Sequence, residues 1–259
     1  MDGLETLGSL VRSPNKVQLL ERLSAEPTTA DELAEAYDVH RRTIVRNLND
    51  LEASGWVVTD GRMYRLAPAT RVFLPDLLDV IRDVDTASRL VTFFECVSSD
   101  TVDIPIAALE DATVVSTDSN AEREPLSTAC ETVSASTNVR AVVPVLSPMI
   151  AEVFGTAIEN DSLTETILAV DVADTLRSMS GHGLYAEFKA NDVRVYVTDS
   201  THSHGLIMTD RSVLIVGYDD GIARVLVRGD SPEFREWAMG MLDRQRTAAR
   251  PVPTLTEEG

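Results

Sequence analysis

The sequence predicts an α/β protein that has a small, mainly helical N-terminal domain and a larger C-terminal α/β domain. Two observations lead to this class. Helical patterns followed by a short hairpin fill the first 68 residues, and strand and helix patterns alternate after residue 99. A hydrophobic content of 44% over 259 residues is enough to bury a large core. We expect domains at 1–68 and 99–248, a helical connector at 69–98 and a flexible tail at 249–259.

The charge is unevenly distributed along the chain. The formal net charge is -19, and the 23 basic residues are all arginine except Lys16 and Lys189. Such a composition resembles that of proteins from salt-accumulating, halophilic archaea, where high ionic strength screens self-repulsion. Residues 40–49 nevertheless hold three arginines and no acid. A local basic patch is a better indicator of an anionic partner than the total charge, so a nucleic-acid partner is not excluded.

The N-terminal elements begin at recognisable capping residues. Ser13 and Pro14 form an N-cap and first-turn pair for a helix over 14–25. Thr29 and Glu32 have the spacing of a capping box, which predicts a short second helix. A third helix is expected over 41–53, with an apolar face and a basic face.

Two short strands around Asp60 and Gly61 complete the N-terminal pattern. Helix, helix, turn, helix and hairpin is the order of a winged helix-turn-helix, in which the third helix enters the DNA major groove. The expected DNA-binding residues lie on that helix and on the hairpin. They are Arg41, Arg42, Thr43, Arg46 and Asn47 on the helix, and Arg62 and Arg65 on the hairpin, the last two contacting phosphates.

The segment TTADELAEAYDVHRRTIVRNLNDLEASGWV resembles the helix-turn-helix of ArsR-like and MarR-like regulators. The resemblance covers about 60 residues and implies binding to double-stranded DNA. His40 departs from it, because such motifs usually have a Ser N-cap at this position, and whether His40 touches DNA stays open. The alternative is a protein-interaction adaptor that has the winged fold and no DNA affinity.

Residues 70–97 are helix-like, with Pro75 placed where a first turn would lie. They could pack on their own domain, or they could form a dimerising spacer between two DNA-reading heads. We expect a homodimer, because one winged head covers only a few base pairs. The connector and the terminal helix that contains Trp237 are the candidate surfaces.

The C-terminal part alternates strands and helices. Strands are expected at 112–115, 140–146, 164–170, 184–189, 193–198, 205–208, 212–218 and 223–227. Helices are expected at 125–136, 148–160, 171–179 and 232–246, the second of them capped by Ser147. A layered structure around a central sheet follows.

This part resembles the sensor domains of archaeal winged-helix regulators. The similar residues are the run from Val142 to Phe154, the strand Thr164-Glu-Thr-Ile-Leu, the strand Val193-Arg-Val-Tyr-Val, the run from Gly205 and the helix with Trp237. The families are the methanogenesis filament regulators, through their middle domain, and the sugar-responsive TrmB regulators; haloarchaeal regulators of the TbsP type have the same layout. The resemblance implies a degenerate phospholipase-D-like fold that binds a ligand without catalysis.

The sequence does not predict an enzyme, a cofactor or a metal site. It contains no Gly-rich phosphate loop and no G-x-S-x-G or H-E-x-x-H motif. His202 and His204 are two residues apart, but Lys189 is the nearest lysine, so the His and Lys pairing of a phospholipase site is missing. We expect exposed loop histidines here, and two inert buried thiols at Cys96 and Cys130.

A small polar metabolite is the expected signal; the alternative is that the residues named below lie in ordinary solvated turns and that the domain only dimerises. Ligands of open α/β sheets bind at the carboxyl ends of strands. The expected site is the loop after residue 198 together with the turn after residue 208: Asp199, Ser200, His202, His204 and Arg211. With no secretory signal and no long apolar stretch, the chain is expected to be a cytoplasmic transcription regulator. The target promoter and the ligand's identity do not follow from the sequence.

Overall fold

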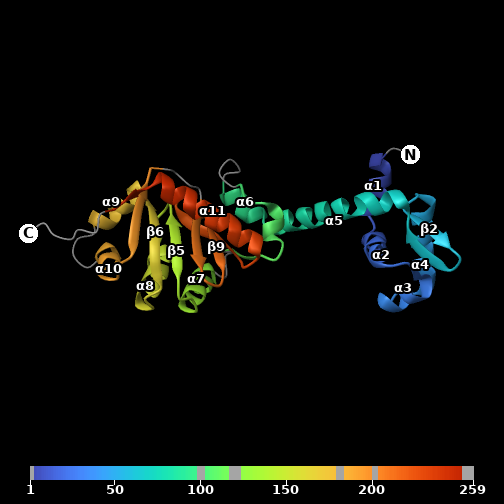
Figure 1. Ribbon diagram of the computed structural model, residues 1–259, viewed down its shortest axis with the longest axis horizontal. Coiled ribbons are helices and arrows are strands. Elements are labelled where there is room, and N and C mark those ends of the chain that lie inside the picture. The colour runs from blue at the N-terminus through green and yellow to red at the C-terminus, as the bar shows by residue number, and fades with distance from the viewer. Residues whose placement is uncertain (1–2, 98–102, 117–123, 179–183, 200–203, 253–259) are drawn as a thin grey trace, which may run out of the picture. The chain divides into compact units, whose positions relative to one another are not determined.

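The computed structural model describes residues 3–97, 103–116, 124–178, 184–199 and 204–252. The chain divides into two compact units, residues 1–82 and 83–259 (Figure 1). The division falls inside one long helix, α5 (Pro68–Arg89). None of the described helices is long and apolar enough to cross a membrane.

The N-terminal unit has the predicted order of elements, preceded by one more helix. Helices α1 (Gly3–Val11), α2 (Pro14–Ala25), α3 (Ala30–Ala36) and α4 (Arg41–Ala53) come first, apart from the short strand β1 (Thr28–Thr29). The hairpin strands β2 (Val57–Asp60) and β3 (Met63–Leu66) follow. The sheet has the order β1-β3-β2, and its strands are antiparallel. The winged helix-turn-helix predicted from the sequence is therefore present.

A glycine ends α4 and sets the entry into the wing. Gly55 has a φ of 78°, and its N–H donates to the carbonyl of Glu52. The N–H of Trp56 donates to the carbonyl of Leu51, which completes a Schellman motif. The Trp56 side chain then joins a core that includes Leu20, Leu48 and Leu66.

The sequence suggested that Pro75 lies in the first turn of a helix. In the structure it lies inside α5. The helix begins instead at Pro68, where the missing N–H costs nothing because first-turn amides have no intrahelical partner. At Pro75 the ring leaves the carbonyl of Arg71 without its usual donor. Leu74, next to the proline, is 1% exposed and packs in the core of the N-terminal unit.

The C-terminal unit is built around an eight-stranded sheet of order β11-β7-β6-β5-β8-β9-β10-β4. Strands β5 (Val139–Val143), β6 (Leu163–Ala169) and β7 (Arg194–Thr198) are parallel to one another. Strands β8 (His204–Thr209), β9 (Val213–Asp219), β10 (Ile222–Gly229), β4 (Thr113–Ser116) and β11 (Arg250–Pro251) join antiparallel to their neighbours. The mixed sheet confirms the predicted α/β class.

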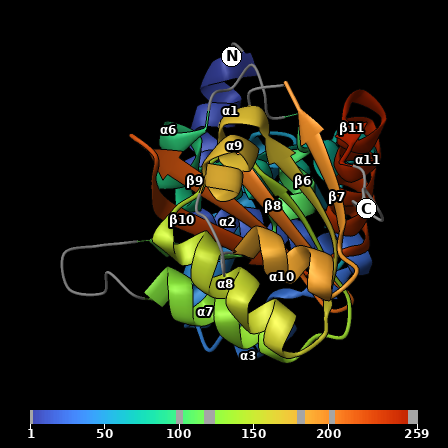
Figure 2. The same ribbon diagram turned by 90° about the vertical axis from the view of Figure 1, so that its left-hand side faces the viewer.

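Helices cover both faces of this sheet (Figure 2). Helices α7 (Glu124–Ser134), α8 (Pro148–Glu159), α9 (Val170–Ser178) and α10 (Leu184–Ala190) pack on one face. Helices α6 (Val91–Cys96) and α11 (Pro232–Ala248), with the 3-10 turn η1 (Ile106–Leu109), pack on the other. The result is a three-layer α/β/α sandwich with two apolar cores.

Residues 184–189 form a helix, so the strand predicted there is wrong. The alternation of apolar and polar residues indicated a strand, but Ala, Glu and Lys favour helix. The aromatic ring of Phe188 is 1% exposed and packs edge-on against Phe154 of α8, with centroids 5.4 Å apart. The helix thus buries Phe188 against α8.

The predicted flexible tail is also corrected in part. Arg250 and Pro251 form β11, which pairs with Val197 and Tyr196 of β7. The N–H of Val252 donates to the carbonyl of Val195. The expectation for residues 253–259 lies outside the described residues.

Candidate nucleic-acid interface

The helix-turn-helix is held by a reciprocal capping box at the start of α3. The Glu32 carboxylate accepts hydrogen bonds from the backbone N–H of Thr29 at 2.8 Å and from its hydroxyl at 2.9 Å. The Thr29 hydroxyl oxygen accepts from the N–H of Glu32 at 3.3 Å. The bond from the Thr29 backbone, followed by the one from its hydroxyl, lowers the pKa of Glu32. The capping box predicted from the sequence is confirmed.

Three contacts fix α4 in the unit. Its apolar stripe, which includes Ile44, Leu48 and Leu51, is buried in the core. Near the end of the helix, the Asp50 carboxylate forms an ion pair with the Nζ of Lys16 in α2, at 3.0 Å. Glu52 accepts a hydrogen bond at 3.1 Å from the N–H of Thr59 in the wing. The exposed face of α4 is therefore presented on a rigid support.

The exposed face of α4 lines a surface groove with a volume of about 720 Å³. Its lining residues are His40, Arg42, Thr43, Val45, Arg46, Asn49 and Asp50. Arg42 and Arg46 are exposed, and Thr43 is half-buried. Within the described part of the chain, neither arginine forms an ion pair with a carboxylate. Their guanidinium groups are thus available to an anion or to the acceptor edges of bases.

Two of the predicted DNA-binding residues on α4 are placed differently. Asn47 is only 6% exposed, so its side chain cannot reach a ligand at the helix surface. Its position explains the error, because 44, 47, 48 and 51 form one i, i+3, i+4, i+7 stripe. Arg41 is exposed but forms an ion pair with Asp31 of α3. The structure therefore gathers Arg42, Thr43 and Arg46 in the groove and buries Asn47.

The wing carries the other two predicted arginines. Arg62 is exposed in the turn between β2 and β3, beside Gly61, whose φ is 65°. Arg65 lies within β3 and is half-buried. The wing thus presents one exposed and one partly exposed arginine.

The ligand residues predicted in the C-terminal unit do not form one site. Asp199 follows β7, at the carboxyl ends of the parallel strands, where its carboxylate pairs with Arg250 at 3.4 Å. Arg211 is exposed beyond the other end of β8, which runs antiparallel to β5. Five residue steps along β8 separate the two ends by roughly 17 Å. The grouping of Arg211 with Asp199 is therefore wrong. Ser200 and His202 lie outside the described residues.

The sequence suggested that His204 is an exposed loop residue, and this prediction is wrong. It is the first residue of β8 and is only 1% exposed. Its ring stacks on Trp237 of α11, with centroids 6.3 Å apart and an interplanar angle of 28°. The Trp237 Nε1–H donates to Asp103 at 2.9 Å. His204 is therefore part of the packing between the sheet and α11.

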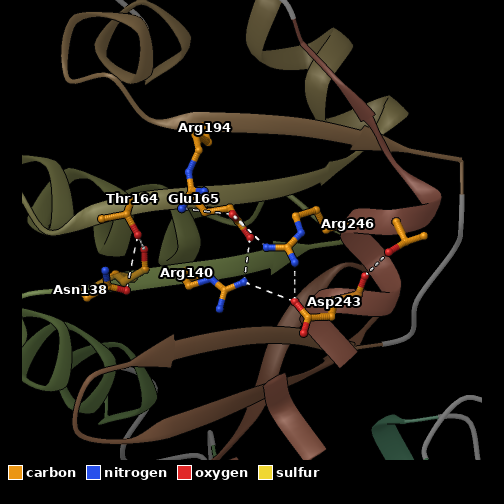
Figure 3. A network of polar contacts seen from close by, with 9 residues as sticks. Asn138, Arg140, Thr164, Glu165, Arg194, Asp243 and Arg246 are labelled. Atoms are coloured by element: carbon orange, nitrogen blue, oxygen red, sulfur yellow. Dashed lines mark hydrogen bonds and ion pairs between the residues drawn. The ribbon is translucent and has the colours of Figure 1, made fainter. Parts of the chain in front are cut away.

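A charged network that the sequence analysis did not identify joins α11 to the parallel strands (Figure 3). The Glu165 carboxylate of β6 is 0% exposed and accepts a hydrogen bond from Arg140 of β5 at 3.0 Å. Arg194 of β7 and Arg246 of α11 lie 3.3 Å and 3.8 Å from its second oxygen. Asp243 pairs with Arg246 at 2.7 Å. The only available signal was a glutamate inside a strand that the sequence predicted.

The N-terminal unit also has an apolar groove, with a volume of about 610 Å³. It lies between α1, the end of α4 and α5, and its apolar lining comprises Leu7, Trp56, Ala69, Phe73, Leu77 and Val80. Several apolar side chains on α1 and α5 are exposed: Leu4 is 78%, Val72 80% and Val80 56% exposed. An apolar groove of this size is typical of an interaction site.

Both parts of the chain match models of known protein families. Residues 4–89 match the family model described as the HVO_A0261 N-terminal domain. Residues 123–248 match the model of the methanogenesis regulatory protein FilR1, middle domain. No curated protein sequence matches the chain significantly.

The solved structures that the chain matches include that of the archaeal chromatin protein TrmBL2. The match has 15% identity and a TM-score of 0.40, and it covers 91% of this chain and 92% of that one. A homodimeric winged helix-turn-helix domain from Mycobacterium bovis has 24% identity and a TM-score of 0.28, covering 31% and 78%. A transcriptional regulator from Rhodococcus sp. RHA1 has 13% identity and a TM-score of 0.25, covering 86% and 92%.

The family models, rather than these alignments, carry the assignment. The predicted similarity to the methanogenesis regulators is confirmed for residues 123–248. The degenerate phospholipase-D-like fold stays a prediction. Residues 4–89 are thus similar to the HVO_A0261 N-terminal domain and residues 123–248 to the FilR1 middle domain, and the two matches together support an archaeal-type winged helix-turn-helix regulator.

Proposed function

We propose that the protein is a transcription regulator that reads double-stranded DNA with α4. The observation that carries this proposal is the groove on α4, where the exposed Arg42 and Arg46 have no carboxylate partner among the described residues. A major groove about 12 Å wide admits a helix, and its guanine edges accept bidentate hydrogen bonds from arginine. In a chain with a net charge of -19, cations left free of carboxylates at one face favour an anionic partner.

The wing supports the same orientation. Arg62 and Arg65 would contact phosphates beside the groove while α4 contacts bases. The alternative is a protein-interaction adaptor without DNA affinity. Such an adaptor would not need two unpaired arginines on the helix that a winged fold presents to DNA.

We further propose a homodimer formed through α1 and α5. Its support is the apolar groove beside Trp56 and Phe73, together with the exposed Val72 and Val80. Burying these side chains against a second copy would remove apolar surface from water. Two heads related by a two-fold axis would then read half-sites about one helical turn apart.

The C-terminal unit is proposed to sense a small polar metabolite, with no catalytic role. The edge at the carboxyl ends of β5, β6 and β7 is the proposed location, without Arg211. Support comes from Tyr218 at the end of β9, which is 7% exposed and whose hydroxyl has no hydrogen-bond partner among the described residues. Burial raises the pKa of this tyrosine, so the hydroxyl stays protonated and is an unsatisfied donor beside this edge of the sheet.

A selection experiment tests DNA reading directly. The full-length protein would be incubated with a random-sequence duplex library, and the bound duplexes would be recovered and sequenced. We expect an enriched inverted repeat whose half-sites are about 10 base pairs apart. No enriched sequence over repeated rounds, at low and at high salt, would contradict DNA reading by α4.

A thermal-shift screen tests the sensing role. Central metabolites would be added to the full-length protein at high salt, and the melting transition of the C-terminal unit would be followed. A bound compound raises the melting temperature because it binds only the folded state. The shift should be lost in Tyr218→Phe and kept in Arg211→Ala; a hit that responds only to Arg211→Ala would contradict the proposed location.

A further inference from the structure

His40 stands at the N-cap position of α4, and its side chain already has one defined hydrogen bond. The imidazole Nδ1 accepts from the backbone N–H of Arg42 at 3.1 Å. An N-cap side chain normally satisfies one of the first amides of a helix in this way, and Ser, Thr, Asp or Asn usually fill the position. Here a ring with a second nitrogen performs the task.

The cap decides where the imidazole proton lies. A nitrogen that accepts a hydrogen bond carries no proton, so the neutral ring must be protonated at Nε2. Accepting at Nδ1 therefore makes Nε2–H a hydrogen-bond donor. A serine cap has a single oxygen beside the backbone and could not place a donor as far from the helix end.

The surroundings of the donor are those of the proposed DNA interface. His40 is exposed and lines the same groove as Arg42, Thr43 and Arg46. It also lies at the N-terminus of a 13-residue helix, where the first-turn amides favour negative charge. The neighbouring cation Arg41 is paired with Asp31, so it does not compete for an anion at this end.

We propose that His40 is a further DNA contact, whose Nε2–H donates to a backbone phosphate while its Nδ1 caps α4. This rests on the proposed DNA-binding function. The ring would orient the amide of Arg42 and bind the phosphate at the same time. A neutral donor to a phosphate adds affinity without sequence preference and without releasing a counterion.

Three variants separate the two tasks. Replacement of His40 by Nε2-methylhistidine keeps the acceptor Nδ1 and removes the donor. His40→Ala removes both, whereas His40→Ser restores a short cap. Binding of the full-length protein would be measured by fluorescence anisotropy with a labelled 30-base-pair duplex, recovered from the random library by the wild-type protein, over a series of salt concentrations.

The methylated protein should bind about tenfold more weakly than the wild type, the loss expected for one hydrogen bond to a charged acceptor, with an unchanged melting temperature. Its salt slope should equal that of the wild type, whereas Arg62→Ala, which removes a proposed phosphate contact of the wing, should reduce the slope by about one. His40→Ala should lose affinity and also melt earlier, and His40→Ser should recover the melting temperature without the affinity.

Wild-type affinity in the methylated protein would overturn the proposal, because the donor would then have no role. A reduced salt slope in that variant would also overturn it, because it would indicate a charged rather than a neutral contact. Failure of the proposed function itself looks different: the wild-type protein would then show no sequence-selected binding at all.

Discussion

The carboxylate of Glu165, which is 0% exposed, accepts a hydrogen bond of 3.0 Å from the guanidinium group of Arg140 on the neighbouring parallel strand. Arg194 and Arg246 approach the same carboxylate from β7 and α11. Burying a carboxylate is unfavourable unless it is paired. The three guanidinium groups replace the interactions that the carboxylate would make with water. The network ties the last long helix to the centre of the sheet.

Removing the central charge should therefore destabilise the C-terminal unit. We expect Glu165→Gln to lower its free energy of unfolding by about 3 kcal/mol, because three guanidinium groups lose their buried partner. Urea denaturation followed by Trp237 fluorescence in a Trp56→Phe background measures the change. Arg194→Gln is the control: its side chain is 59% exposed, and its removal should cost less than about 1 kcal/mol. Equal costs would contradict a central role for Glu165.

The capping box should give the N-terminal unit a defined pH dependence. The pKa of Glu32 is lowered by the N–H and the hydroxyl of Thr29, so the folded state favours the carboxylate. This stability is present above the ordinary glutamate pKa of about 4.3 and is lost as the pH falls through the lowered folded value. Glu32→Gln keeps a hydrogen-bond acceptor but does not titrate.

The stability difference between wild type and Glu32→Gln should therefore be larger at pH 6 than at pH 3. Trp56 fluorescence in a Trp237→Phe background reports the unfolding of this unit. Glu35→Gln, which removes an exposed carboxylate from the same helix without touching the box, is the matched control. A difference for Glu32→Gln that is the same at both pH values would contradict the capping argument.

Much of the N-terminal unit follows from its sequence because local signals there agree with one another. The capping box, the 41–53 helix and the hairpin each depend on a few neighbouring residues, and the structure confirms them. The burial of Asn47 could have been predicted from the same helical projection, because Asn47 lies on the stripe formed with Ile44, Leu48 and Leu51. The face of α4 toward solvent was predicted correctly at Arg42 and Arg46.

The C-terminal unit was predicted less well because its site residues are brought together by topology. The direction of β8 relative to β5 decides that Arg211 lies away from Asp199, and no short pattern specifies that direction. In residues 184–189, the helix buries Phe188 against Phe154, a residue 34 positions earlier in the chain, and no local pattern predicts that contact. Glu165 could have been suspected, because parallel strands covered on both faces rarely contain a charge without a partner.

Assembly through α1 and α5 predicts a monomer when their apolar surface is made charged. Val72→Asp combined with Val80→Asp should shift the protein from dimer to monomer, because two carboxylates would have to be buried in the interface. Sedimentation equilibrium at micromolar concentration measures the state. Ile222→Asp, a change at a 55% exposed apolar residue of the C-terminal unit, is the control and should leave the dimer intact. A wild-type monomer, with and without DNA, would contradict the proposed assembly.

The wing is expected to contact phosphates rather than bases. Truncation of both Arg62 and Arg65 to Ala should weaken binding by a similar factor on the selected duplex and on an unrelated one. The slope of log affinity against log salt should fall by about two, since two counterion-releasing contacts are lost. Arg71→Ala, in the exposed first turns of α5, is the control for a general charge effect. A loss confined to the selected duplex would instead indicate base reading by the wing.

The most direct measurement is DNA affinity after charge reversal on α4. The double change Arg42→Glu and Arg46→Glu should weaken binding to the selected duplex by at least about a hundredfold, since each arginine is worth roughly 1–3 kcal/mol and the new carboxylates repel phosphate. The control is Arg177→Glu with Arg224→Glu, which changes the net charge equally at exposed sites of the C-terminal unit. With normal melting in both proteins, we expect the control to bind within about twofold of the wild type. Affinity of the Arg42 and Arg46 double variant equal to that of the control would contradict DNA reading by α4.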